Sequence, residues 1–438
     1  MQRQLANGLI LRSISEGYAR DYERLAQFYV DVFTDAGSDS QEEKIVSYWT
    51  RDLLDGHPTV THDDLFVVVD PAHDDKIVSA TVLIPQRWHY EEVEMWVGRP
   101  ELVATTREYR RRGLIRAQFE AMHERCAALG INVLGITGNS HFYRQFGYTM
   151  AVELEDHAAI NTSLIKKPDN LRFTLRMAAE ADAADLAAWT AYFARQRLLS
   201  VVYDESLWRY EISGKLRLHP WYMPPFIIVD ETGAGVGYVV LRDNDWHERI
   251  SCMMYVVGEQ SSYLETFNDV LYGIKQWATE RFGSCPPRLT FYTGLDDTIS
   301  DLIERHRSGA VYHNEEVWYL RVVDLTRFLR EITPVLERRL HGSGANRYTG
   351  TLAIGFYNYT GITLHFDKGH LVQVISGALD EHDADVSLPG YTLWDLIFGY
   401  RTLDELRFAH PEVLPNPKAA VLLSILFPKQ LSWLIPFA

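Results

Sequence analysis

The chain has 438 residues and a mass of 50.4 kDa, which exceeds the usual size of one hydrophobic core and predicts two or three domains. Its composition, 47% hydrophobic and 23% charged, is that of a globular protein. Lys and Arg number 43 against 59 Asp and Glu, and this net charge of −16 argues against binding to nucleic acid or to an anionic membrane.

The cysteines and the two ends of the chain indicate its environment. Cys126, Cys252 and Cys285 are odd in number and widely spaced, so they predict neither a disulfide framework nor a zinc knuckle. The N-terminal segment lacks the apolar core of a signal peptide. The apolar C-terminal segment is interrupted at residues 428–430 and predicts a buried helix followed by a strand instead of a membrane span. We therefore expect a reduced, cytoplasmic, soluble protein.

Residues 1–157 alternate between helical and strand patterns, which predicts an α/β domain around a mixed sheet. Apolar residues at helical spacing predict helices over 19–34, 42–54, 113–129 and 140–146. Segments rich in β-branched and aromatic residues predict strands over 8–14, 64–70, 76–91, 93–106, 131–137 and 148–154.

The polar segment 158–170 is typical of a linker, and residues 171–341 then repeat the order of elements of the first domain. We interpret this second domain as a duplicate of the first, with strands over 171–178, 225–230, 236–243, 249–257 and 288–294. Its helices are predicted over 180–199, 204–217, 263–281 and 325–341. Residues 342–438 differ from both domains, because three meandering strands followed by helices predict an antiparallel sheet covered by helices.

Residues 103–130 carry the strongest chemical signal of the chain. A predicted strand leads into a loop with several arginines, and Gly113 then opens an amphipathic helix. A helix N-terminus presents free N–H groups and partial positive charge, which together favour an anion such as phosphate. A glycine at this position lets the phosphate approach closely. A solvated arginine run is the alternative interpretation; the sequence matches neither a P-loop nor a dinucleotide fingerprint.

Two motifs give this region a family resemblance. The segment from Arg110 to Ile115 resembles the (Gln/Arg)-x-x-Gly-x-(Gly/Ala) signature of the GNAT superfamily of acyl-CoA-dependent N-acyltransferases, with Ile115 in place of the last small residue. Residues 142–148 resemble the family's Tyr-x-x-x-Gly-(Phe/Tyr) element. The three-part layout further resembles the enhanced intracellular survival (Eis) acetyltransferases. That resemblance implies an α+β fold with two tandem GNAT-like domains, the second degenerate, followed by a sterol-carrier-like domain.

The resemblance also implies acetyl-CoA as co-substrate and a set of residues that hold it. Backbone groups of the strand around Val103 would bind the pantetheine arm, and a bulge there would aim an N–H group at the thioester. The arginine loop would bind the pyrophosphate. The implied cofactor-binding residues are Val103, Ala104, Thr105, Arg110, Arg111, Arg112, Gly113, Leu114, Ile115, Arg116, Gly138 and Asn139.

Two groups are implied for proton transfer. Tyr143 matches the family's general acid, which protonates the leaving thiolate; a tyrosine that only packs in the core is the alternative. The resemblance to Eis enzymes suggests a C-terminal carboxylate, here on Ala438, as general base, although the chain departs from the usual aromatic ending. Cys126 lies on the apolar helix face and is interpreted as a core thiol. His123 and His141 lack partners at metal-ligand spacing, so no metal site is predicted.

The expected reaction is direct transfer of an acetyl group to a primary amine. Cationic acceptors suit an acidic chain, and the resemblance implies aminoglycosides, polyamines or lysine side chains, together with a homo-oligomer, a hexamer. Five residues could form a cation-binding lining: Phe33, Asp35, Asp39, Trp88 and Trp96. Two alternatives remain: a carrier of an apolar ligand with a vestigial acyltransferase site, and an aminoacyltransferase that uses aminoacyl-tRNA.

Overall fold

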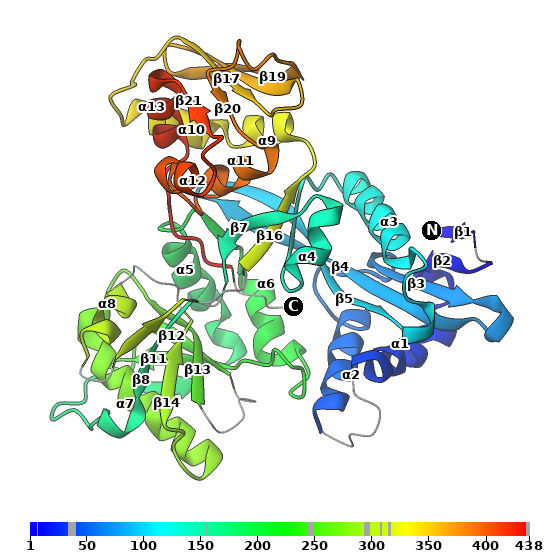
Figure 1. The fold of residues 1–438 in the computed structure, drawn as a ribbon. Coiled ribbons are helices and arrows are strands. Elements are labelled where there is room, and N and C mark those ends of the chain that lie inside the picture. Colours follow the sequence, from blue (N-terminus) through cyan, green and yellow to red (C-terminus); the bar gives the residue numbers. More distant parts are fainter. Residues whose placement is uncertain are drawn as a thin grey trace.

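The computed structural model describes residues 1–6, 8–33, 41–154, 156–242, 249–292, 298–306, 309–313 and 317–434. The fold is α+β and contains three mixed sheets, which confirms the predicted fold class. Figure 1 shows the first sheet beside the second, with the third sheet and its helices above both.

The first sheet has the order β1-β2-β3-β4-β5-β6-β16-β7, with β10 paired to β4 beyond the end of β3. Among the described strands of this sheet, only β5 and β6 pair in parallel. Helices α1 (Tyr18–Phe33) and α2 (Gln41–Leu54) share an apolar core on one face, and α3 (Leu114–Ala128) packs on the other. The strands are β1 (Gln2–Gln4), β2 (Ile10–Ser13), β3 (Leu65–Asp70), β4 (Lys76–Tyr90), β5 (Val93–Thr105), β6 (Val133–Ile136), β7 (Thr149–Glu153), β10 (Leu199–Val201) and β16 (Val317–Val322).

The second sheet, in the order β15-β8-β14-β13-β12-β11-β9, repeats the plan of the first. Its one parallel pair, β13 with β14, takes the place that β5 and β6 take in the first sheet. The strands are β8 (His157–Asn161), β9 (Thr174–Met177), β11 (Pro225–Val229), β12 (Gly235–Arg242), β13 (Arg249–Val257), β14 (Arg288–Phe291) and β15 (Ala310–Tyr312). Its helices are α5 (Ala183–Ala194), α6 (Glu205–Arg209), α7 (Tyr263–Phe282) and α8 (Thr298–Glu304).

The two sheets exchange one strand each, which the sequence did not predict. Strand β8 lies in the segment interpreted as a linker, yet it pairs with β14 and β15 in the second sheet. Strand β16 lies within the predicted second domain, yet it pairs with β6 and β7 in the first sheet. The linker prediction over 158–170 is therefore wrong at its start, because pairing between residues far apart in sequence leaves no local pattern.

Two predicted helices are also shorter than expected. The helix predicted over 180–199 ends at Ala194, and the chain then forms β10, which pairs with β4. The helix predicted over 204–217 consists of α6 and one π-helical turn, Tyr210–Gly214.

The third region contains β17 (Gly350–Gly355), β18 (Thr360–Asp367) and β19 (His370–Ala378), which form the predicted antiparallel meander. Short strands β20 (Val386–Ser387) and β21 (Leu414–Pro415) complete the sheet. Helices α11 (Leu393–Ile397), α12 (Leu403–Ala409) and α13 (Pro417–Leu426) follow the meander as predicted. Helices α9 (Leu325–Glu331) and α10 (Thr333–His341) contact β19, so they cover this third sheet and do not close the second unit.

A C-terminal segment ties the three regions together. After α13 the chain descends to the centre of the molecule (Figure 1). The Leu198 N–H donates to Leu431 O at 2.7 Å, and the Trp433 N–H donates to Leu199 O at the same distance. The indole N–H of Trp318, on β16, donates to Leu434 O at 3.1 Å. The segment is therefore bonded to β10 and β16, which both lie in the first sheet.

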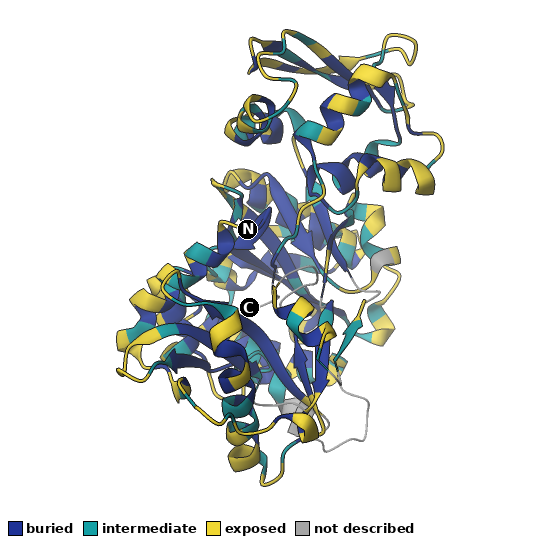
Figure 2. Cartoon of the chain, turned by 90° about the vertical axis from the view of Figure 1, so that its left-hand side faces the viewer, coloured by how far each residue is buried: buried dark blue, intermediate teal, exposed yellow. Residues whose placement is uncertain are grey.

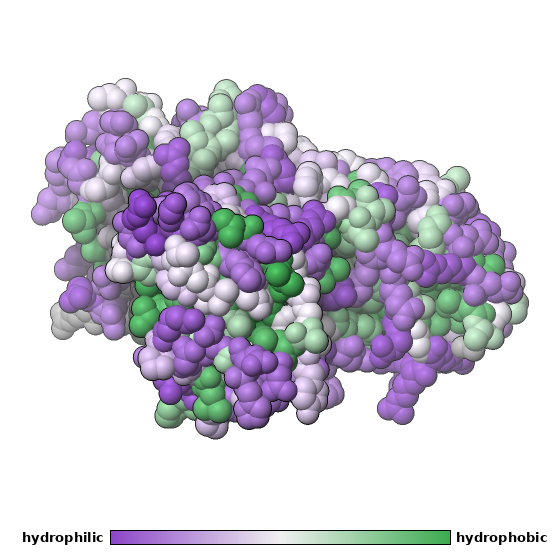
Figure 3. Space-filling view, turned by 90° about the horizontal axis from the view of Figure 1, so that it is seen from above, coloured by the Kyte–Doolittle hydropathy of each residue, from purple (hydrophilic) through white to green (hydrophobic). Residues whose placement is uncertain are grey.

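Burial follows the sheets. Figure 2 shows buried strands enclosed by helices whose outer faces are exposed. Hydrophilic residues cover most of the face in Figure 3, with hydrophobic residues in small separate groups, as expected of an acidic, charged surface. Of the helices that the structure describes, none is long and apolar enough to span a bilayer.

Candidate active site

Strands β5 and β6 separate soon after they meet. Their parallel pairing covers only Val97 with Val133 and Gly98 with Leu134, after which β5 continues with β4 alone. Between Ala80 and Val82 the register with β4 shifts, so that β5 carries one extra residue at Leu102–Val103. Leu102 adopts a left-handed φ of 49°, which is costly for a leucine and marks a strained bulge. This bulge was predicted, and it lies at the edge of the gap between the two strands.

The arginine loop closes one end of this gap. Arg111 and Gly113 have left-handed φ values of 62° and 77°, a geometry that turns successive N–H groups to the same side. The first backbone bond of α3 is donated by Ala117 to Gly113 O at 3.1 Å, so the N–H groups before Ala117 have no partner within the helix. The Arg110 side chain donates to Thr105 O at 3.1 Å and fastens the loop to the end of β5.

Two glycines leave open space where an anionic ligand would lie. A Cβ atom added at Gly113 or at Gly138, which has a φ of 96°, would meet no atom within 4 Å. Arg111, Arg112, Arg116 and Asn139 are exposed beside them. These free N–H groups, exposed guanidinium groups and open glycines fit the anionic part of coenzyme A.

Tyr143 ends α4 (Ser140–Tyr143) on the far side of the gap. Its ring lies against Phe119 of α3, with centroids 6.1 Å apart, and against Phe142 at 5.3 Å. Burial, and then the charge of Glu101, raises the pKa of Tyr143 well above its ordinary value, so the phenol stays protonated at neutral pH. Among the described residues no hydrogen-bond partner reaches its hydroxyl, which remains available to a ligand.

Glu101 is a candidate site residue that the sequence analysis did not identify. It immediately precedes the bulge, and its side chain is 15% exposed. Burial raises the pKa of Glu101, while the neighbouring Arg99 guanidinium and the Leu102 N–H lower it. The charge of Glu101 contributes, after burial, to the raised pKa of Tyr143. A single carboxylate in a long strand has no motif, so only its place beside the bulge distinguishes it.

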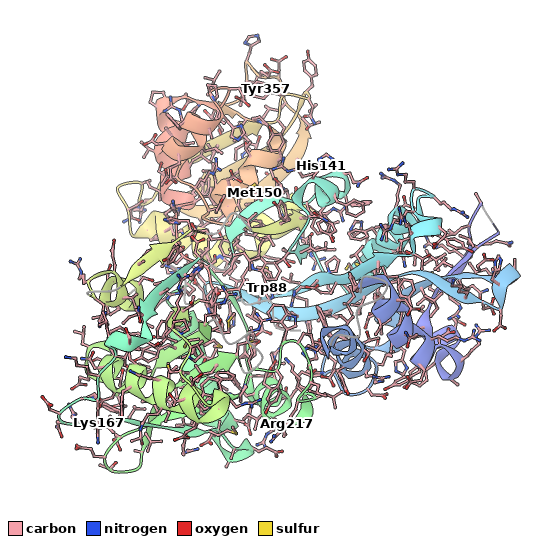
Figure 4. The ribbon with its side chains drawn as sticks, turned by 60° about the horizontal axis from the view of Figure 1, so that its bottom comes forward. Trp88, His141, Met150, Lys167, Arg217 and Tyr357 are labelled. Atoms are coloured by element: carbon pink, nitrogen blue, oxygen red, sulfur yellow. The ribbon has the colours of Figure 1, made fainter. Side chains whose placement is uncertain are left out.

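Several predicted residues do not lie where the sequence analysis expected them. Trp88 is 1% exposed and lies in the core at the centre of the molecule (Figure 4), so it does not line a cation pocket. Trp96 is exposed and lines a cavity of about 210 Å³ between β4 and the second unit. Phe33 is exposed at the end of α1. Asp35, Asp39 and Ala438 lie outside the described residues.

Other nucleophiles and ligands have structural roles. Cys126 is fully buried, and burial raises the pKa of its thiol to about 12, as expected of a core residue. Burial, together with the charge of Arg321, lowers the pKa of His123 to about 4, and its Nε2 lies 3.3 Å from the Tyr148 hydroxyl. Within the described ranges no group of three or more His, Cys, Asp or Glu could hold a metal ion.

The comparison with known families agrees with this geometry. The family model for the GNAT acetyltransferase domain matches residues 13–151, which contain the bulge, the arginine loop and Tyr143. This segment is similar to GNAT acetyltransferase domains. The match spans β3 to β6 and the start of β7, and it leaves out β1, β10 and the exchanged strand β16 of the first sheet. No curated protein matches the chain by sequence.

Solved structures resemble the whole chain in fold. A probable N-acyltransferase from Enterococcus faecalis has a TM-score of 0.68 at 15% identity and covers 98% of this chain and 100% of its own. A GCN5-related N-acetyltransferase from Anabaena variabilis has a TM-score of 0.67 at 14% identity, covering 97% and 98%. Eis1 from Mycobacterium abscessus has a TM-score of 0.65 at 17% identity, covering 98% and 99%. The resemblance to an Eis protein thus extends beyond the GNAT domain.

Proposed function

We propose that the protein is an acetyl-CoA-dependent N-acetyltransferase that transfers the acetyl group directly to a primary amine in a ternary complex. The observation that carries the proposal is the geometry that follows β5: a strained bulge at Leu102–Val103, and then an arginine loop that leads into a helix start whose N–H groups have no partner within α3. The GNAT match over residues 13–151 supports the reaction class.

Acetyl-CoA, when bound, supplies the thioester that carries the acetyl group. The N–H groups at the start of α3 and the guanidinium groups of Arg111 and Arg112 would hold its phosphates. The bulged edge of β5 would pair with the amide groups of the pantetheine arm and orient the thioester. Residues proposed to contact it are Val103, Ala104, Thr105, Arg110, Arg111, Arg112, Gly113, Leu114, Ile115, Arg116, Gly138 and Asn139.

The two proton transfers are assigned to different residues. Glu101, as a carboxylate, would accept a proton from the attacking amine, directly or through one water. Burial raises the pKa of Glu101, and its ion pair with Arg99 opposes that rise and so favours the carboxylate form. Tyr143 would donate its phenolic proton to the leaving sulfur, and its raised pKa ensures that the proton is present at neutral pH. Ala438 remains the alternative base, and deletion of this residue tests it separately.

The proposed acceptor is a cationic primary amine such as an aminoglycoside, a polyamine or a lysine side chain. The acidity of the chain supports it, since residues 1–60 carry ten Asp and Glu against six Lys and Arg. We further propose a homo-oligomer, a hexamer, which light scattering after size-exclusion chromatography would test.

Titration calorimetry with acetyl-CoA separates the proposed function from its alternative. An enzyme binds acetyl-CoA at micromolar concentration and releases free thiol when a panel of amines is added. A carrier of an apolar ligand with a vestigial site gives no heat with acetyl-CoA, and that result would refute the proposal. Binding without thiol release for any amine would leave a cofactor site but contradict the transferase activity.

A further inference from the structure

Trp318 joins three parts of the molecule within the first sheet. It lies on β16, the strand that the second unit contributes to the first sheet, and its side chain is fully buried. Its ring meets Trp88 of β4 edge to face, with centroids 5.6 Å apart. Its indole N–H donates to Leu434 O in the C-terminal segment. A residue far from the GNAT motifs is thus built into the sheet that carries the site.

The same ring supports the buried cation beside Glu101. Arg99 is 1% exposed, and the carbon atom of its guanidinium lies 5.1 Å from the centroid of the Trp318 ring. A buried guanidinium is costly unless its charge is compensated, and Arg99 is compensated by Glu101 and by the electron-rich face of this indole. Trp318 therefore fixes one side of Arg99 while Glu101 binds the other.

We propose that Trp318 is a positioning residue for the transfer reaction: through Arg99 it holds the Glu101 carboxylate in the place and charge state that a general base requires. This inference rests on the proposed function, because it assigns a role relative to Glu101 as base. The strand exchange then has a functional role. Strand β16 lies outside the residues that match the GNAT domain, and it brings the Trp318 ring into contact with Arg99.

Few charged or titratable groups besides Arg99 act on this carboxylate. Tyr143 of α4 interacts with the charge of Glu101, and Tyr203, which follows β10, interacts with that of Arg99. Both phenols have raised pKa values, from burial first, and are neutral at neutral pH. Arg99 is the cation paired with Glu101 and lowers its pKa against the effect of burial, so a change in the position of Arg99 should change the proton affinity of the carboxylate.

The test compares Trp318→Leu and Trp318→Phe with wild type through the pH profile of kcat/KM with one fixed amine. A carboxylate base makes kcat/KM rise with pH through its pKa. Leucine removes the aromatic face, Arg99 loses its position, and the rising limb should move to higher pH by roughly one unit. Phenylalanine keeps a weaker aromatic face and should move the limb less, in the same direction. Activity lost at neutral pH should return at high pH.

The controls separate the possible failures. Trp277→Leu, in α7 of the second unit, removes a tryptophan far from Arg99 and should leave the limb unchanged. Acetyl-CoA affinity and melting temperature of each variant report whether it is folded. The inference would be overturned if the rising limb of kcat/KM stayed at the same pH in both folded Trp318 variants. It would also be overturned if kcat/KM fell by the same factor at every pH. A wild-type protein that transfers no acetyl group would instead overturn the proposed function.

Discussion

The first and second units share the same arrangement of strands, and they also share the position of a β-bulge. Both sheets have the same strand order, and each contains one parallel pair at the same place. The long central strand of each carries a bulge: β5 at Leu102–Val103, and β13 at Met253, where Val240 pairs with Met254 but Leu241 with Cys252. The fold, including its bulge, is therefore not sufficient for a site.

The side chains on this shared framework differ between the two units. The residue before the bulge is Glu101 in the first unit and the buried Cys252 in the second. The helix after the bulged strand begins at the open Gly113 in one unit, whereas in the other Ser262 caps it by accepting the Glu265 N–H at 3.3 Å. The second loop, residues 258–262, contains no arginine. The comparison teaches that, on one shared framework, a few positions distinguish the proposed anion-binding and proton-transferring site from the corresponding part of the second unit.

Replacement of the proposed base should give the largest effect. Glu101→Gln should lower kcat/KM about 100-fold and remove the rising limb of its pH profile, because the amide cannot accept a proton. The matched change in the second unit, Cys252→Ala, should cost about 1 kcal/mol of stability and leave kcat/KM unchanged. Steady-state kinetics across pH check both variants. An unaffected Glu101→Gln enzyme would place the base elsewhere.

Loss of the proposed acid should have a somewhat smaller effect. Tyr143→Phe should lower kcat at least tenfold while the Kd for acetyl-CoA stays unchanged, because the ring still packs but the proton donor is gone. Tyr148→Phe, a control nearby, should leave kcat unchanged because its buried hydroxyl only meets His123. Stopped assays and calorimetry measure the two quantities. Equal losses in kcat and in affinity would mean that Tyr143 is structural.

Removal of charge from the loop should weaken binding without affecting chemistry. The double variant Arg111→Ala, Arg112→Ala should raise the Kd for acetyl-CoA about tenfold, and the difference should shrink at high salt. Arg305→Ala, which removes an exposed arginine at the end of α8 in the second unit, should not change the Kd. Calorimetry at two salt concentrations decides between the arginine loop as a binding site and as an ordinary solvated surface.

The smallest effects concern the two helix starts. Gly113→Ala forces an alanine into a φ of 77° and should cost about 1 kcal/mol. Ser262→Ala removes a cap and should cost a similar amount. Only the Gly113 variant should also weaken acetyl-CoA binding, which thermal denaturation with and without the ligand would reveal. Ligand binding impaired equally by both variants would contradict the assignment of the site to the first unit.

The sequence predicted most of the local structure of the site. The strand over 93–106, the loop and the helix after Gly113 were all predicted. Their signals, apolar spacing and a glycine that adopts a left-handed φ, come from residues that are close together in the sequence. The duplication was also inferred from the repeated order of elements. Glu101 was missed because the residues next to it in the sequence form no motif that would distinguish it from any other carboxylate in a strand. Trp88 was misplaced because its burial depends on Trp318, which is distant in sequence.

The sequence by itself thus determined the α+β fold class and the left-handed turn at Gly113 before α3, since both arise from short-range periodicity and backbone preference. Only the tertiary structure decided which residues meet there. The exchange of β8 and β16 between sheets and the contact of Arg99 with Trp318 both join residues far apart in the chain. Such contacts depend on burial and pairing of the whole chain, which local patterns do not encode.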